Sequence, residues 1–295
     1  AAYVLEKKDW MVTCYRENAG LFWRGLPMEK ILLHWMGDER GNHIDSCNVT
    51  PLAIAIGSQM LHATDLAWAS KYKKDGGIAC TFFGDGATSE GDFHEAANFA
   101  ANLDLPVVFV CQNNGWAIST PTKLECSAPT VAQRGIAYGM DCVQVDGNDL
   151  FAMVKVVRDA VTNARENNRP TFIEALTYRL GDHTTADDAR RYRDADELAM
   201  WENRDPMIRL RNYLEQKDLW SSSKEEEQLA VAATTVSQVV KNAEEIDAPT
   251  SNDFFDSMFV DLPPQLQKQR QTMRTSSIGQ DPSQISQPTQ EGVVK

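Results

Sequence analysis

Short apolar runs alternate with stretches of helical periodicity through the first 180 residues or so of the chain. Four runs are expected to be strands buried on both faces of a sheet, at residues 78–83, 107–111, 142–145 and 171–176. Between them, residues 88–103 and 149–163 place apolar side chains three and four positions apart, which predicts helices. The alternation predicts an α/β fold, with a mostly parallel sheet flanked by helices on both faces.

The second half of the chain is less regular. Residues 181–194 are polar and have no periodicity, which predicts a surface loop of the kind that often carries function. Helices are expected at 199–214, 225–243 and 262–273, with a connector at 249–252. The Ser-, Gln- and Pro-rich end predicts a disordered tail or a partner-binding arm. The predicted organisation is therefore an α/β domain at 1–220, a helical extension at 221–275 and a tail at 276–295.

The composition narrows the classes of partner. A net charge of −13 argues against nucleic acid and against an anionic membrane surface, because both would be repelled. The sequence has no apolar run near the ~20 residues that span a bilayer, and the first residues lack the apolar core of a signal peptide. The six cysteines are scattered without a CxxC pair, which predicts reduced thiols in a reducing compartment.

The tripeptide Gly84-Asp85-Gly86 follows one predicted strand and opens a predicted helix. A simple interpretation is a tight turn, in which the glycines supply unusual backbone angles and Asp85 caps the helix. A dinucleotide-binding fingerprint is less favoured, because Ser89 occupies its third glycine position and no acidic residue ends a following strand at the expected distance. The tripeptide alone leaves the choice between a turn and a ligand site open.

A second polar turn changes that balance. After 26 intervening residues, Asn113-Asn114-Gly115 follows the next predicted strand. Parallel strands end at the same edge of a sheet, so the Asp85 carboxylate and the Asn114 amide oxygen are expected to converge there. Oxygen ligands with open positions suit a hard dication that also binds phosphate. The glycines would let the backbone approach a diphosphate, and the helix expected after Gly86 would point its amide groups at it.

This spacing is that of the thiamine diphosphate motif, and the chain resembles the alpha chain of the decarboxylating component of 2-oxo acid dehydrogenases, a family that includes the pyruvate and branched-chain enzymes. The resemblance runs from about Tyr15 to about Arg270. It implies that the α/β domain at 1–220 binds thiamine diphosphate. The matching segments are YRE (15–17), GDGATSEGDFHEAANFA (84–100), CQNNGWAISTPT (111–122), VDGND (145–149), EALTYR (174–179) and GDHTTADDARRYR (181–193).

The resemblance implies roles for individual residues. Mg²⁺ would be held by Asp85, Asn114 and the backbone carbonyl of Trp116. Without the family, a surface salt bridge would be the better interpretation of Arg16, and core packing is an equal alternative for Ile56. The implied cofactor-binding residues are Tyr15, Arg16, Ile54, Ile56, Gly84, Asp85, Gly86, Ala87, Gln112, Asn114, Arg179 and His183.

His183 is the implied catalytic residue. It lies on the polar loop and matches the family histidine at the reaction centre, where a group titrating near neutrality can bind the substrate carboxylate or pass a proton during transfer to the lipoyl group. Thr184 and Thr185 occupy the stretch that mitochondrial relatives phosphorylate at serine, which leaves such regulation open. The charged residues at 187–193 are expected to order the loop by ion pairs, or simply to form an exposed charged face.

The chain also departs from the family pattern. Gln112 stands where the branched-chain relatives carry an arginine, so one cationic contact to the diphosphate would be missing. The sequence begins close to Tyr15, whereas family members carry a substantial stretch before this point. The N-terminal part of the family domain is therefore expected to be missing.

The family further implies partners. The glutamate that activates the cofactor would come from a beta chain, so this chain would be active only in an assembly of two alpha and two beta chains. The acyl group would pass from a small 2-oxo acid to a lipoyl domain of the core acyltransferase. Pyruvate is favoured slightly over branched-chain substrates. The alternatives are an acetoin dehydrogenase alpha chain and a non-catalytic structural subunit. The expected compartment is a bacterial cytoplasm, or the mitochondrial matrix in a eukaryote.

Overall fold

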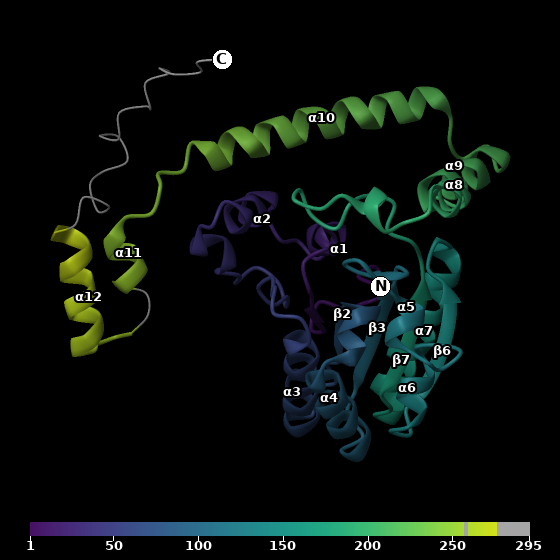
Figure 1. The fold of residues 1–295 in the computed structure, drawn as a ribbon, viewed down its shortest axis with the longest axis horizontal. Helices are drawn as coiled ribbons and strands as arrows, with labels where there is room; N and C mark the ends of the chain where they lie inside the picture. Colours follow the sequence, from purple (N-terminus) through teal and green to yellow (C-terminus); the bar gives the residue numbers. More distant parts are fainter. Residues whose placement is uncertain (257–258, 276–295) are drawn as a thin grey trace. The chain divides into compact units, whose positions relative to one another are not determined.

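A five-stranded sheet forms the centre of the chain in our computed structural model, which describes residues 1–256 and 259–275 (Figure 1). Every pair of neighbouring strands is parallel. This confirms the predicted α/β fold class, and it places the ends of β2 and β3 side by side at one edge. The strands, in their order across the sheet, are β1 (Trp10–Val12), β2 (Ala79–Gly84), β3 (Val107–Asn113), β7 (Thr171–Leu176) and β6 (Asp141–Asp146).

Helices cover both faces of this sheet (Figure 1). On one face the buried side chains come from α3 and α4, and on the other they come mainly from α1, α2 and α7. The bounds in this part of the chain are α1 (Asn18–Trp23), α2 (Met28–Trp35), α3 (Ser58–Lys73), α4 (Gly91–Asn102), α5 (Thr122–Glu125), α6 (Gln133–Ile136) and α7 (Leu150–Asn167), the 3₁₀ turns η1 (Glu39–Asn42), η2 (Asp85–Ser89) and η3 (Ala189–Arg191), and the hairpin of β4 (Trp116–Ala117) and β5 (Thr120–Pro121).

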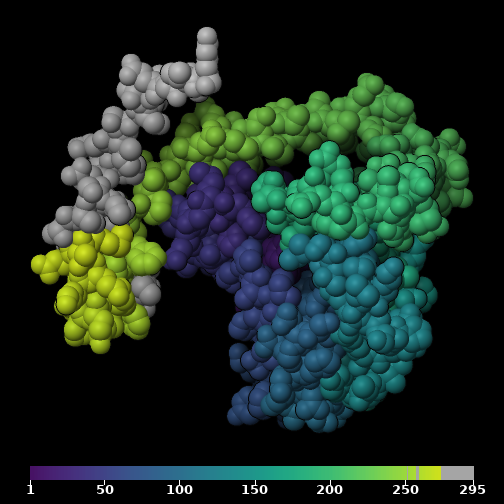
Figure 2. Space-filling view, in the orientation of Figure 1, coloured from purple at the N-terminus to yellow at the C-terminus, as the bar shows by residue number. Residues whose placement is uncertain are grey.

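The core fixes the strands that lead to the motif. Successive residues of a strand point to opposite faces, so Phe82 packs in the α7 layer while Phe83 packs in the α3–α4 layer. The Phe83 ring lies 6.4 Å from Phe109 and 5.9 Å from Phe172, centroid to centroid. Each such pair contributes about 0.5–1.5 kcal/mol beyond area burial. Figure 2 shows these blue and teal segments as one continuous packed body.

Several sequence predictions are wrong in detail. The helix expected at 199–214 is two helices, α8 (Ala195–Glu202) and α9 (Pro206–Gln216), because Asp205 caps a new helix and Pro206 occupies its first turn. The strand at 142–145 was expected to be buried on both faces, but β6 is an edge strand and most of it is accessible. The regular helix expected directly after Gly86 is the 3₁₀ turn η2, and α4 begins only at Gly91.

The chain divides into two compact units, residues 1–240 and 241–295. Helix α10 (Ser222–Glu244) crosses this boundary. In the second unit, α11 (Ser251–Asp256) begins inside the predicted connector and precedes α12 (Pro264–Thr275), with an ion pair of 2.6 Å between Asp256 and Arg270. The predicted domain boundary at 220 stays a prediction, and the predicted tail at 276–295 lies outside the described residues.

All six cysteines are free thiols, as predicted. Across the described parts of the chain, we find no helix that is both long enough and apolar enough to cross a membrane.

Candidate functional site

Asp85 is a buried carboxylate at the edge where β2 ends. Only 2% of the residue is exposed, and its two oxygens accept from two different segments. Oδ1 accepts from the backbone N–H of Asn114 at 3.3 Å, and Oδ2 accepts from the Thr122 hydroxyl at 2.5 Å. Burial raises the pKa of Asp85, while the hydrogen bond from Thr122 opposes that rise. The residue is thus a desolvated acid held by neutral donors.

The Asn113–Asn114 turn meets Asp85 through the backbone N–H of Asn114, whereas the spacing predicts convergence of the Asn114 amide oxygen with the carboxylate. Asn114 Oδ1 accepts from the backbone N–H of Trp116 at 3.1 Å, and Gly115 adopts a φ of +85° that favours glycine. The backbone of Gly86 lies directly against this turn. A Cβ added there would come 2.6 Å from the Ala117 Cβ, so only glycine permits the close approach.

The simple turn interpretation of Gly84-Asp85-Gly86 does not fit this geometry. Gly84 has a φ of −82°, which any residue can adopt, and no side chain caps η2. A Cβ added at Gly84 would meet nothing within 4 Å. Neither backbone angle nor protein packing therefore explains a glycine there, whereas open space above the backbone suits the close approach of a ligand.

Arg179 brings a buried cation to the same edge. It follows β7, is 7% exposed, and donates to the carbonyl of Ile118 at 2.7 Å and to the Tyr192 hydroxyl at 2.6 Å. A longer contact of 3.5 Å reaches the carbonyl of Trp116. Its Nε is buried and has no hydrogen-bond partner among the residues that the structure describes. An unsatisfied buried donor on a cation is costly in a closed core and is suited to an anionic ligand.

His183 and Arg16 contact each other although 167 positions separate them. One guanidinium nitrogen of Arg16 lies 3.2 Å from His183 Nδ1 and 3.2 Å from the His183 carbonyl. Arginine can only donate, so Nδ1 accepts and Nε2 carries the proton of the neutral ring. Burial, Arg16 and Arg179 all lower the pKa of His183. Asp187 orders the loop by accepting from the His183 N–H at 2.8 Å and from the Tyr192 hydroxyl at 2.5 Å.

Two further predicted residues, Tyr15 and Gln112, contact Arg16 and Glu17 in the segment before α1. Tyr15 stacks under Arg16, whose guanidinium carbon is 5.5 Å from the ring centroid. Gln112 donates to Glu17 at 2.7 Å, so in this structure its amide is turned towards that carboxylate. Ile54 and Ile56 are 57% and 40% exposed, which rules out core packing as their role. Ala87 is buried in η2.

Two site residues were missed by the sequence analysis. Thr122 lies within the matched segment 111–122, but its bond to Asp85 depends on the fold of the hairpin between them. Glu125 had no sequence signal. Burial first, and then the neighbouring charge of Asp85, raise the pKa of Glu125 to about 7, and its Oε2 is buried without a hydrogen-bond partner.

The donor set decides which metal would fit. Within residues 1–256 and 259–275 no cluster of three or more His, Cys, Asp or Glu side chains could hold a metal ion. Asp85, Asn114 and the Trp116 carbonyl instead offer one carboxylate, one amide and one backbone oxygen. Such a set suits Mg²⁺, which commonly takes one or two carboxylates and completes its shell with water and phosphate.

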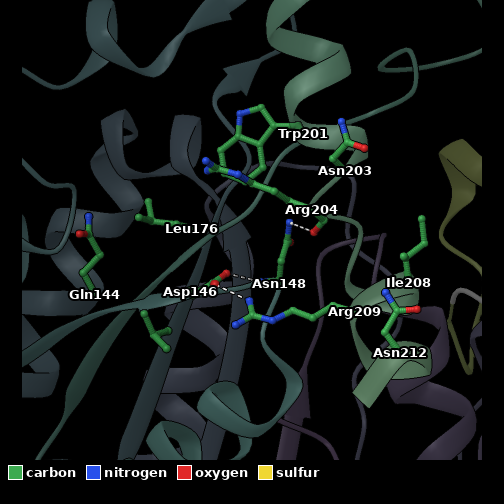
Figure 3. Close-up of a pocket in the computed structure, with 11 residues that line it drawn as sticks. Gln144, Asp146, Asn148, Leu176, Trp201, Asn203, Arg204, Ile208, Arg209 and Asn212 are labelled. Atoms are coloured by element: carbon green, nitrogen blue, oxygen red, sulfur yellow. Dashed lines mark hydrogen bonds and ion pairs between the residues drawn. The ribbon is translucent and has the colours of Figure 1, made fainter. Parts of the chain in front are cut away.

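A separate cavity of about 540 Å³ opens at the carboxyl ends of β6 and β7 (Figure 3). Its wall includes Asp146, which forms a 2.6 Å ion pair with Arg209, and Arg204, whose guanidinium lies 5.2 Å from the Trp201 ring centroid. None of the predicted cofactor residues is among its lining side chains. The predicted site is therefore separate from this cavity.

Comparison with known proteins agrees with the motif and the fold. Residues 1–252 match the family model described as dehydrogenase E1 component. The 3-methyl-2-oxobutanoate dehydrogenase subunit alpha of Mycobacterium tuberculosis is 42% identical over 277 residues, which cover 93% of this chain and 75% of that protein. The pyruvate dehydrogenase E1 component subunit alpha of Staphylococcus aureus is 39% identical over 269 residues, which cover 90% and 73%. The chain belongs to the dehydrogenase E1 component family, a family of thiamine-diphosphate-dependent oxidoreductases.

Proposed function

We propose that the chain is the alpha subunit of a 2-oxo acid dehydrogenase and that it holds the diphosphate end of thiamine diphosphate through Mg²⁺. The observation that carries the proposal is the buried Asp85 carboxylate, which meets the Asn114 turn at the shared end of β2 and β3. Parallel α/β sheets bind ligands at this edge. Asp85, Asn114 and the Trp116 carbonyl would hold the metal.

Two arginines would hold the diphosphate. Arg16 is exposed and already lies at the edge with Tyr15, while Arg179 is buried and keeps one donor unpaired. A guanidinium can contact two phosphate oxygens at once, which fixes orientation as well as charge. The open space above Gly84 would admit the diphosphate close to the backbone. Ile54 and Ile56, both exposed, would line the cofactor's bend.

When bound, thiamine diphosphate supplies the electron sink that lets a 2-oxo acid lose carbon dioxide. The chain's own contribution to the chemistry would come from His183. Its lowered pKa keeps the ring neutral near pH 7, and Arg16 on Nδ1 leaves the Nε2 proton available. That N–H can donate a hydrogen bond to the substrate carboxylate, and the neutral ring can take up a proton and pass it on during acyl transfer to the lipoyl group.

The substrate class is a small 2-oxo acid. One similar protein is named for 3-methyl-2-oxobutanoate and another for pyruvate, at 42% and 39% identity, so identity does not separate the two substrates. Both are named as alpha subunits, which supports a beta partner. We further propose an assembly of two alpha and two beta chains, with a lipoyl domain of the core acyltransferase as the acceptor. Free cysteines suit a reducing compartment, which we propose to be a bacterial cytoplasm, or the mitochondrial matrix in a eukaryote.

The test is to purify the chain with its beta partner, strip metal with a chelator, and titrate Mg²⁺ and thiamine diphosphate while following tryptophan fluorescence. Decarboxylation of pyruvate and of 3-methyl-2-oxobutanoate is then compared at saturation. Cofactor binding that requires Mg²⁺, with turnover of one of the two acids, is the expected result. A complex that binds no cofactor at any Mg²⁺ concentration would refute the proposal.

A further inference from the structure

We propose that Glu174 is a positioning residue for the metal ligands, and that it acts through the side chain of Asn113. The inference rests on the proposed function, because the metal and the cofactor are themselves part of that proposal. Glu174 lies in the middle of β7 and is 1% exposed. It lies beside Cys111 of β3 and Gln144 of β6 in the sheet register.

A carboxylate at such a depth is costly unless both oxygens are hydrogen-bonded. Glu174 meets this requirement with two neutral donors. Oε1 accepts from the Asn113 side-chain amide at 2.8 Å, and Oε2 accepts from the backbone N–H of Ala132 at 2.8 Å. The first bond reaches the end of β3, directly before the predicted ligand Asn114. The second reaches Ala132, directly before α6, so the carboxylate connects β7 both to the end of β3 and to the start of α6.

The bond from Glu174 fixes which way the Asn113 amide points. A carboxylate can only accept, so the amide nitrogen must face Glu174 and the amide oxygen must face the other way. That oxygen lies 3.1 Å from the Gly115 N–H and 3.2 Å from the Thr122 hydroxyl. Holding Gly115 closes the turn that presents Asn114. A flipped amide would turn its nitrogen towards the Gly115 donor and break this contact.

Thr122 carries the arrangement to Asp85. Its hydroxyl donates to Asp85 Oδ2, and its backbone N–H donates to the Gly115 carbonyl at 3.0 Å. The path therefore runs from Glu174 through Asn113 to Gly115 and Thr122, and ends on Asp85. The links are hydrogen bonds between groups that are at least partly buried, from Asn113 to Gly115, from Gly115 to Thr122 and from Thr122 to Asp85. The Thr122 hydroxyl has one hydrogen, which it gives to Asp85, so its 3.2 Å approach to the Asn113 oxygen adds no independent bond. Loss of Glu174 should therefore loosen two metal ligands that it does not touch.

Glu174 and Asn113 can exchange their roles as hydrogen-bond acceptor and donor, because a carboxylate and an amide of the same length are available at each position. In Glu174→Gln alone, the new amide supplies one oxygen for two donors, so either Asn113 or Ala132 loses its acceptor. In Asn113→Asp alone, two carboxylates face each other. In the double variant, the introduced glutamine amide donates to the introduced aspartate, and the glutamine oxygen still accepts from Ala132. The aspartate's second oxygen still accepts from Gly115, so the three hydrogen bonds of the wild-type pair are available again.

The experiment measures the Mg²⁺ concentration for half-maximal thiamine diphosphate binding in the complex with the beta subunit, together with kcat at saturating Mg²⁺ and cofactor. Outer-shell partners of metal ligands are typically worth about 10–100-fold in affinity. We expect Glu174→Gln and Asn113→Asp each to raise that concentration about tenfold and to leave kcat within about threefold. The double variant should return to within about threefold of the wild type.

Asp9→Asn is the matched control. Asp9 is another fully buried carboxylate that accepts a backbone N–H, but it lies before β1, at the opposite edge of the sheet. It should lower the melting temperature without changing the Mg²⁺ requirement. The inference is overturned if Glu174→Gln binds Mg²⁺ and cofactor as the wild type does, or if the double variant is no better than the single ones. Failure of the wild-type complex to bind would instead refute the proposed function.

Discussion

Two acidic residues stand at the carboxyl ends of parallel strands in one sheet, and their surroundings differ in kind. Asp85, after β2, is 2% exposed and accepts hydrogen bonds from the neutral donors Asn114 and Thr122. Asp146, at the end of β6, has a side chain that is 52% exposed and forms an ion pair with Arg209. The negative charge of Asp146 is already neutralised by the protein, whereas that of Asp85 remains available to a cation from solution.

The cavity and the predicted binding site therefore lie at different strand ends, the cavity at β6 and β7 and the predicted site at β2 and β3. The acids beside the cavity, Asp146 and Asp149, are both paired with Arg209, at 2.6 Å and 2.8 Å. The Asp85 edge has a buried Arg179 donor without a partner among the described residues, an acid whose pKa is raised by burial, and open space over Gly84. Buried polar groups without partners and a shifted pKa therefore indicate the site better than the volume of a cavity does.

The largest effect is expected from Asp85→Ala. Removing the single carboxylate of the ligand set should weaken Mg²⁺-dependent cofactor binding by at least about 100-fold, because the remaining ligands are neutral oxygens. Binding is measured by fluorescence titration of the complex with the beta subunit, with Asp85→Asn as the isosteric control. Retention of wild-type affinity by the alanine variant would show that the metal is bound elsewhere.

His183→Ala separates binding from chemistry at the same edge. His183 contacts Arg16 but none of the predicted metal ligands, so the dissociation constant for the cofactor should change by no more than about threefold. Reductive acylation of a lipoyl domain should fall by about 10²–10⁴, the usual range for general acid–base groups. Stopped-flow acyl transfer and equilibrium binding are compared on the same preparation. A parallel loss of both would place His183 in cofactor binding alone.

The pH dependence tests the role of the same ring. Burial, Arg16 and Arg179 lower the pKa of His183 below its ordinary 6.5, so the neutral ring is favoured in the folded protein. Its contribution is therefore fully present above pH 6.5 and is lost as pH falls through the lowered value. Acyl transfer at saturating Mg²⁺ should show an acidic limb with a midpoint below 6.5. The limb should vanish in His183→Ala, and its persistence there would assign it to another group, such as Glu125.

A feature of the fold or of the site could be predicted where the local sequence encodes it, and could not where it depends on the tertiary arrangement. The meeting of Asp85 with Asn114 was predicted, because apolar runs mark the strands and both polar turns follow them directly. The exposure of β6 was not, since burial depends on the position of a strand in the sheet, which a local pattern does not encode. The contacts of Glu174 and Thr122 join residues 61 and 37 positions from their partners. The break before Pro206 was missed, although the proline and the preceding aspartate are a signal for the start of a new helix.

The smallest expected effect is that of Arg209→Met, and it tests the other half of the comparison. The substitution keeps a long apolar side chain and removes both ion pairs, of 2.6 Å to Asp146 and 2.8 Å to Asp149. Because water reaches all three groups, it replaces much of what the ion pairs supply, and exposed pairs contribute little to stability. Chemical denaturation should show only a small shift of the midpoint, and the cofactor dissociation constant should stay within about twofold of the wild type. A large loss of cofactor affinity would mean that the paired acids beside β6 contribute to the site after all, and that charge pairing does not distinguish the two ends of the sheet edge.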